Sequence, residues 1–236
     1  MNYIALVNRT KQEAGRSGGN LATVVGAAGD DLMLCNWVAA AWANIQRLTL
    51  AWRWMRAGVL ASVVPGKNEQ DPAVDMLIQP AGLLPITDCR GFYPATEEYQ
   101  PTILDPANPA GETALWMVDY PRFRAMYTVG VHTAAKPRHW SISPTNKLLL
   151  GPKPDIAYHV RFDYRAAPSV LTMDANIPGM PEEFHLAIVF GALMSLASFD
   201  NAPEVYVRAK NEYRELIAQL YADQGPTFCI GPSPLA

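Results

Sequence analysis

Hydrophobic side chains repeat every three or four positions in the first quarter of the chain. This is the spacing of one face of an α-helix. The stripe consists of Leu34, Val38, Ala41, Ile45, Leu48, Trp52 and Met55. Asp30 and Asp31 are suited to cap its start, and Gly58 is a natural stop. We therefore predict one long helix between the aspartate pair and Gly58, preceded by a shorter helix over residues 2–14 that ends at a glycine-rich turn.

The same spacing returns near the C-terminus. Pro181 suits a first helical turn, and Glu182 and Glu183 are favourably placed against the helix dipole. A second break precedes Pro203, which can begin another helix. The two apolar stripes are Leu186, Val189, Leu193 and Leu196, and then Tyr206, Ala209, Tyr213, Leu216 and Leu220. We predict two further helices here.

Alternation with a period of two marks the middle of the chain as strand. Its clearest segment is 158–165, where Tyr158, Val160, Phe162 and Tyr164 alternate with polar or charged residues. A turn over 143–146 between two apolar segments predicts a hairpin. Shorter strands are predicted at 62–64, 115–120 and 123–129.

The proline distribution separates these regions. None of the 20 prolines precedes Pro65, and sixteen lie from Pro65 to Pro181. Proline disrupts helix interiors, so the middle is set apart from both ends. We predict an α+β fold: a helical bundle built from the N- and C-terminal segments, 1–60 and 180–224, with an inserted antiparallel β domain over 61–179, sandwich- or barrel-like. An extended C-terminal tail covers 225–236.

Composition narrows the function classes. The chain has 236 residues, of which 50% are hydrophobic and 17% charged, with 19 basic against 22 acidic side chains. A net charge of −3 gives no long-range attraction to phosphate, so a sequence-reading DNA binder is not favoured. Three cysteines without a C-x-x-C motif argue against a disulfide scaffold or a zinc site. The apolar segments at 32–54 and 186–199 are predicted to be buried helices, because the first contains polar residues and the second is too short to span a membrane.

We find no catalytic motif. The chain has no P-loop, no G-x-S-x-G elbow and no H-E-x-x-H sequence. We therefore predict no catalytic residue, no metal ligand and no cofactor. A hydrolase stays as an alternative, which a deep pocket holding His185 beside Glu182 and a third polar group would support.

Tryptophans and the C-terminal tail are the candidates for binding. Trp37, Trp42, Trp52 and Trp54 fall in the one predicted helix, where burial is favoured and stacking of single-stranded nucleic acid is the alternative. Trp42 and Trp54 are candidates for contacts between subunits if they lie off the apolar stripe. The tail cannot fold alone, and it is expected either to dock on a partner or to be a disordered terminus. Its candidate residues are Phe228, Ile230, Pro232, Pro234 and Leu235.

The order of short motifs along the chain resembles the head-to-tail adaptor proteins of short-tailed bacteriophages, the tail tubular protein A-like group. The resemblance covers nearly the whole chain. It rests on residues 6–15, Ser17-Gly18, Gly29-Asp30, Trp37-Val38, Ala41-Trp42, Ile45-Gln46, residues 52–55, Ile142-Ser143-Pro144, Leu150-Gly151-Pro152, Pro154-Asp155, Tyr158, Tyr164, Pro168, Leu171, Ile177-Pro178, Met180-Pro181-Glu182, His185 and Ala202-Pro203-Glu204.

This resemblance implies a structural protein of the virion neck that assembles in the host cytoplasm and does not bind a membrane. Members form a homo-oligomeric ring, commonly of twelve subunits, between the portal protein and the tail nozzle. The helical part is expected to build the ring, the β domain to project toward tail proteins, and the C-terminal segment to bind the portal. Viral DNA is expected to pass through the lumen without being read.

Overall fold

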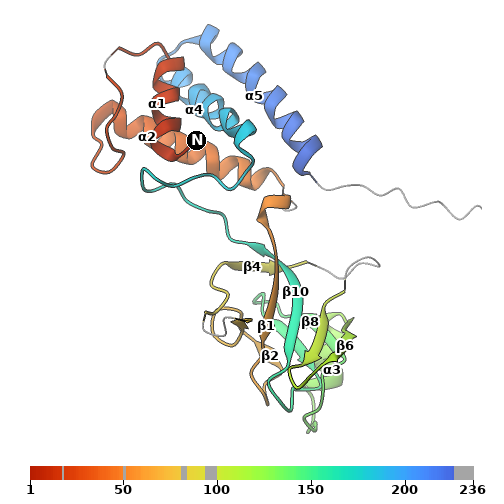
Figure 1. Cartoon of the computed structure of the whole chain (residues 1–236). Coiled ribbons are helices and arrows are strands. Elements are labelled where there is room, and N and C mark those ends of the chain that lie inside the picture. The colour runs from red at the N-terminus through yellow and green to blue at the C-terminus, as the bar shows by residue number, and fades with distance from the viewer. Residues whose placement is uncertain (18, 50–51, 81–83, 94–99, 226–236) are drawn as a thin grey trace, which may run out of the picture. The chain divides into compact units, whose positions relative to one another are not determined.

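A computed structural model describes residues 1–17, 19–49, 52–80, 84–93 and 100–225. The chain divides into two compact units. Met1–Met55 and Pro168–Ala236 form the first, which we call the helical unit, and Arg56–Ala167 forms the second, the β unit. Figure 1 labels the helices and several of the strands along the ribbon. The domain boundaries expected from the sequence lie after residues 60 and 179.

The helical unit brings both ends of the chain into one bundle (Figure 1). Its helices are α1 (Tyr3–Glu13), α2 (Gly29–Leu48), α4 (His185–Phe199) and α5 (Pro203–Gln224), with the short 3-10 turns η1 (Arg53–Met55) and η2 (Glu182–Phe184). Helix α4 packs against α1, α2 and α5, which explains why it is apolar on nearly every face. The predicted α+β architecture is confirmed.

The stretch Glu182–Phe199, which spans η2 and α4, is apolar and long enough to cross a membrane by length and composition. In the structure it is the central element of the bundle. Its side chains at Ile188, Val189 and Leu193 are fully buried against the other helices. A helix at the centre of a protein core has the same composition as a membrane span.

The prediction of one helix reaching Gly58 was wrong. Helix α2 ends at Leu48, and Thr49 already has an extended backbone. Trp52 and Met55 are buried in the core from the segment that follows the helix, and Gly58 lies inside strand β1. The last carbonyl groups of a helix have no partner within the helix. Because α2 ends at Leu48, its last carbonyl groups need hydrogen-bond donors from elsewhere in the chain. The start also differs, because Asp30 and Asp31 occupy the first turn rather than the cap, which is Ala28.

Two sheets form the β unit. Among the described residues, one has the order β3-β1-β10-β5-β6, with β4 also paired to β10, and the other has the order β2-β9-β8-β7. All pairs are antiparallel except β7 with β8. The strands are β1 (Arg56–Ser62), β2 (Glu69–Gln70), β3 (Leu77–Ile78), β4 (Cys89–Phe92), β5 (Thr102–Asp105), β6 (Asn108–Ala114), β7 (Trp116–Met117), β8 (His139–Ile142), β9 (Leu148–Gly151) and β10 (His159–Ala166).

Side chains from both sheets share one hydrophobic core. Val160 and Phe162 of β10 are buried there, and Tyr158 and Tyr164 are nearly so, which confirms the predicted alternation. The predicted hairpin is also present as β8 and β9. The first predicted strand, 62–64, instead begins at Arg56 as β1, which runs beside β10 over seven residue pairs.

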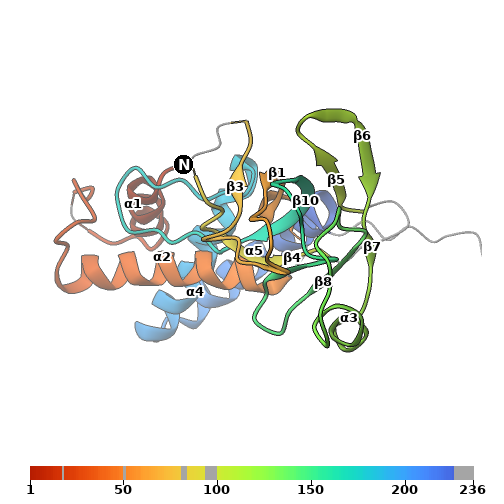
Figure 2. The ribbon, with the colours of Figure 1, turned by 90° about the horizontal axis from the view of Figure 1, so that it is seen from below.

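A helix replaces the strand predicted over 123–129. Helix α3 (Tyr120–Tyr127) follows the short strand β7 and lies beside β8 (Figure 2). Asp119 caps it, because its carboxylate accepts a hydrogen bond from the main-chain nitrogen of Arg122. Pro121 in the first turn favours a helix further. Phe123 is the buried residue of α3. The alternating burial expected for a strand is therefore not found here.

Candidate assembly surfaces

A groove of about 280 Å³ opens between α2, α4 and α5 of the helical unit. Its lining is uncharged and is made of Ala41, Asn44, Gly191, Met194, Ser195, Ser198, Tyr206 and Tyr213. Gly191 allows the close helix packing, because a Cβ atom there would lie 3.1 Å from the Cβ atom of Ala41 and 3.3 Å from the ring of Tyr213, which is tighter than an ordinary contact. Small side chains thus let three helices approach and leave a concave, uncharged surface, which a partner can cover without burying a charge.

The outward side of α2 continues this uncharged surface. Leu32, Asn36, Ala40 and Asn44 are all exposed and follow one another at intervals of four residues. Charged residues of α2 are confined to its two ends. A surface helix normally presents charged side chains to water, so this face is unusual for a protein that remains a monomer.

An aromatic pair borders the same surface. The rings of Trp37 in α2 and Phe199 in α4 have centroids 5.6 Å apart, and Phe199 is 62% exposed. The sequence pattern did not predict this pair, although Trp37 stands one position off the apolar stripe. Exposed aromatic side chains are enriched where proteins meet.

The structure places the two predicted inter-subunit tryptophans mainly within their own chain. Trp42 is only 1% exposed, and its indole nitrogen donates to the main-chain oxygen of Ser169 over 3.0 Å. Trp54 is half-buried and stacks on Trp52 with ring centroids 4.4 Å apart. Trp42 and Trp52 are thus core residues, as the burial interpretation predicts, and neither presents a ring for stacking nucleic acid.

His185 is buried and is not accessible to a ligand from solvent. It is 1% exposed, and its Nε2 atom lies 3.1 Å from the main-chain oxygen of Met180. Its Nδ1 atom lies 2.7 Å from the amino nitrogen of Met1, which also donates to Glu182. Burial lowers the pKa of His185, assisted by the positive amino group. This arrangement is a structural contact that ties α1 to the start of α4.

Side chains able to hold a metal ion are dispersed: no cluster of three occurs in the part of the chain that the structure describes. Burial raises the pKa of the Cys35 thiol and raises that of Cys89 to about 11, which disfavours the reactive thiolate form of both. The predicted portal-binding residues Phe228, Ile230, Pro232, Pro234 and Leu235 lie outside the described residues.

The uncharged face of α2 and α4 is suited to contacts with another protein. Comparison with known families shows to which class of protein the chain belongs. The family model for the SU10 adaptor protein matches residues 1–228. The chain belongs to the SU10 adaptor protein family. A search of curated proteins found no match.

The family match spans both units of the adaptor and reaches the beginning of its C-terminal tail. It confirms that the protein is a phage adaptor, a structural class of virion component. Membership of an adaptor family implies surfaces that bind other virion proteins.

Proposed function

We propose that this adaptor is a head-to-tail connector of the tail tubular protein A-like kind. In this proposal, copies of the chain form a closed ring, most simply a dodecamer, that joins the portal protein to the tail nozzle and lines the conduit for viral DNA. The family match supports the adaptor class, and the resemblance to connectors of short-tailed phages supports the neck position.

The uncharged face of α2 and α4 is the observation that supports the ring. A ring uses heterologous contacts, in which one face of a subunit meets a different face of the next. The groove lined by Gly191 and Ser195, with the exposed ring of Phe199 close by in α4, offers an uncharged surface that can be covered without burying a charge. We assign this face, rather than Trp42, to the contact between neighbouring subunits.

Portal binding is assigned to the tail. The sequence from residue 224 to residue 236 carries no charged side chain and contains Phe228, Ile230 and Leu235 between glycines and prolines. A short uncharged segment with three apolar anchors fits a crevice on a partner protein. Pro232 and Pro234 restrict the backbone before binding, which lowers the entropy lost when the segment docks.

The low net charge fits a conduit. Each phosphate contact made by a lysine or arginine adds affinity for DNA. A chain with 19 basic and 22 acidic residues therefore lets DNA pass without holding it strongly.

Analytical ultracentrifugation of the purified adaptor, alone and mixed with purified portal protein, tests this proposal. We expect the adaptor to sediment together with the portal protein as one complex that contains a ring of adaptor subunits. Deletion of residues 226–236 should abolish this complex. A monomer that never associates with portal protein at micromolar concentrations would contradict the proposal.

A further inference from the structure

The groove between α2, α4 and α5 has the chemistry of a binding site for a proline-containing peptide. Tyr206 and Tyr213 of α5 both line it. Asn44 of α2 and Ser195 and Ser198 of α4 line it as well, and all three are exposed, so their hydrogen-bonding groups are available to a ligand. Proline-rich segments dock in grooves lined by aromatic side chains. Their main-chain carbonyl groups have no internal partner and can accept hydrogen bonds from the walls of such a groove.

The C-terminal tail of the chain has the matching chemistry. Residues 226–236 contain Pro226, Pro232 and Pro234 and carry no charged side chain. Prolines favour the extended polyproline II conformation. The lining of the groove is also uncharged, so this segment can cover the groove without burying a charge.

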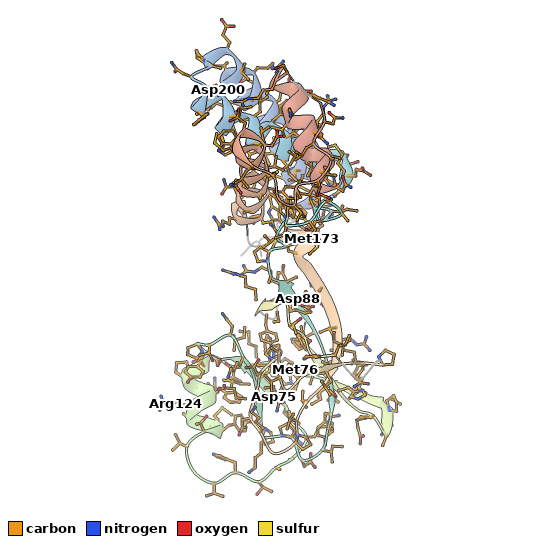
Figure 3. All side chains as sticks on the ribbon, turned by 90° about the vertical axis from the view of Figure 1, so that its left-hand side faces the viewer. Asp75, Met76, Asp88, Arg124, Met173 and Asp200 are labelled. Carbon is orange, nitrogen blue, oxygen red and sulfur yellow. The ribbon has the colours of Figure 1, made fainter. Side chains whose placement is uncertain are left out.

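The tail is long enough to reach the groove of its own subunit. The groove lies toward the turn between α4 and α5, where Asp200 follows α4 (Figure 3). Helix α5 ends at Gln224, about 17 Å along its axis from Tyr213, at 1.5 Å per residue. If residues 225–227 reverse the direction of the chain, residues 228–236 still span about 28 Å in a polyproline II conformation. The segment around Pro234 can therefore lie beside Tyr213.

We propose that residues 226–236 bind this groove of their own subunit before assembly, with prolines against the tyrosine rings, and leave it when they bind the portal protein. This inference rests on the proposed function, because the groove is there assigned to the contact between neighbouring subunits and the tail to the portal. The tail and the next subunit then compete for one surface. Portal binding frees the groove, so the ring closes on the portal rather than in solution.

A weak contact is enough for this role. A segment tethered by a short flexible connection has an effective concentration of about 1 mM at a site on the same chain. A free peptide with a dissociation constant of about 100 μM therefore corresponds to a groove that is occupied about 90% of the time by the tethered tail. The same weakness lets the portal protein remove the tail.

Sedimentation velocity without portal protein gives the first test. It compares the full-length adaptor with a variant that ends at Gly225. We expect the truncated variant to self-associate at concentrations at least tenfold lower than the full-length chain, because its groove is open. Equal association of the two chains overturns the inference. Weaker association of the truncated variant also overturns it, and shows that the tail binds a neighbouring copy.

Fluorescence anisotropy with a labelled peptide of residues 226–236 gives the second test. We expect the peptide to bind the truncated variant, and to bind the full-length adaptor at least tenfold more weakly because its own tail occupies the groove. Ser195→Arg in the truncated variant should weaken peptide binding at least tenfold. Gln12→Arg is the matched control, because Gln12 is an exposed residue of α1 outside the groove. A peptide of the same composition in scrambled order should not bind.

The outcomes separate this inference from the proposed function. Failure of the peptide to bind at 1 mM, equal binding to both chains, or binding unaffected by Ser195→Arg overturns the tail site. If a ring still forms on the portal in those cases, the connector function stands and the inference alone falls. A full-length adaptor that forms no ring with portal protein overturns the connector function, and the release of the tail by the portal with it.

Discussion

The indole nitrogen of Trp52 donates a hydrogen bond to the main-chain oxygen of Ile45 over 2.9 Å. This oxygen is among the last four carbonyl oxygens of α2, which have no partner within the helix. Trp52 therefore acts as a side-chain cap for a helix that ends at Leu48. Its ring is fully buried, so the same residue closes the helix and fills the core.

Replacing Trp52 by phenylalanine should destabilise the helical unit. The change leaves a buried carbonyl group without a donor, which costs about 1–3 kcal/mol in the free energy of unfolding. Trp54→Phe is a matched control, because the buried indole nitrogen of Trp54 has no hydrogen-bond partner in the described part of the chain. Urea denaturation followed by circular dichroism measures both. Equal losses in the two variants would show that the Trp52 bond contributes nothing specific.

Truncation of Trp42 should act on folding. Trp42→Ala removes a fully buried ring and its hydrogen bond to Ser169, and we expect a loss of about 3–5 kcal/mol in the free energy of unfolding. Urea denaturation under conditions where the chain is monomeric provides the measurement. A variant as stable as the wild type would contradict the core position of this ring.

Replacing Phe199 should weaken the association between subunits and leave the stability of the monomer nearly unchanged. Phe199→Ser changes an exposed ring, so the stability of the monomer should shift by no more than about 0.5 kcal/mol. We expect association between subunits to weaken at least tenfold, as judged by sedimentation velocity over a concentration series. Val207→Ser, at another exposed apolar position of the helical unit, is the control. Unchanged association of Phe199→Ser would remove this ring from the subunit contact.

His185 should make the helical unit sensitive to mild acid. Burial lowers its pKa in the folded chain below the usual 6.5, so the unfolded chain binds the proton more readily. The stabilising contribution is fully present above pH 6.5 and is lost as the pH falls through the folded value. Chemical denaturation at intervals between pH 7.5 and 5.5 should show a steeper decline for the wild type than for His185→Gln. Parallel declines would exclude His185 as the source.

Asp119 should stabilise α3 as its N-cap. Asp119→Ala removes the acceptor for the main-chain nitrogen of Arg122, and we expect a loss of about 1 kcal/mol. Asp119→Asn keeps the acceptor while removing the charge, and should retain most of the stability. Hydrogen exchange of the α3 amides measures the local effect. Equal protection in the two variants and the wild type would argue against the cap.

Patterns that depend on local spacing could be read from the sequence. The alternation around Val160 and Phe162 predicted β10, because one face of that strand is buried. The stripes around Leu193 and Ala209 likewise predicted α4 and α5. These segments follow the simple rule that apolar periodicity reflects a buried face.

Features that depend on tertiary contacts were missed. The stripe through Trp52 and Met55 kept a helical spacing although α2 ends at Leu48, because buried positions can be supplied by an extended segment and a 3-10 turn. The pairing of Trp37 with the exposed Phe199 could not be predicted either, because it joins two helices that are far apart in the sequence.

Cryo-electron microscopy of the adaptor bound to its portal protein tests the connector function most directly. We expect a closed ring on the tail side of the portal, with the face around Gly191 and Phe199 buried against the next subunit and residues 226–236 in contact with the portal. Portal particles without adaptor density, or adaptor subunits bound separately without contacts between them, would contradict a ring-forming head-to-tail connector.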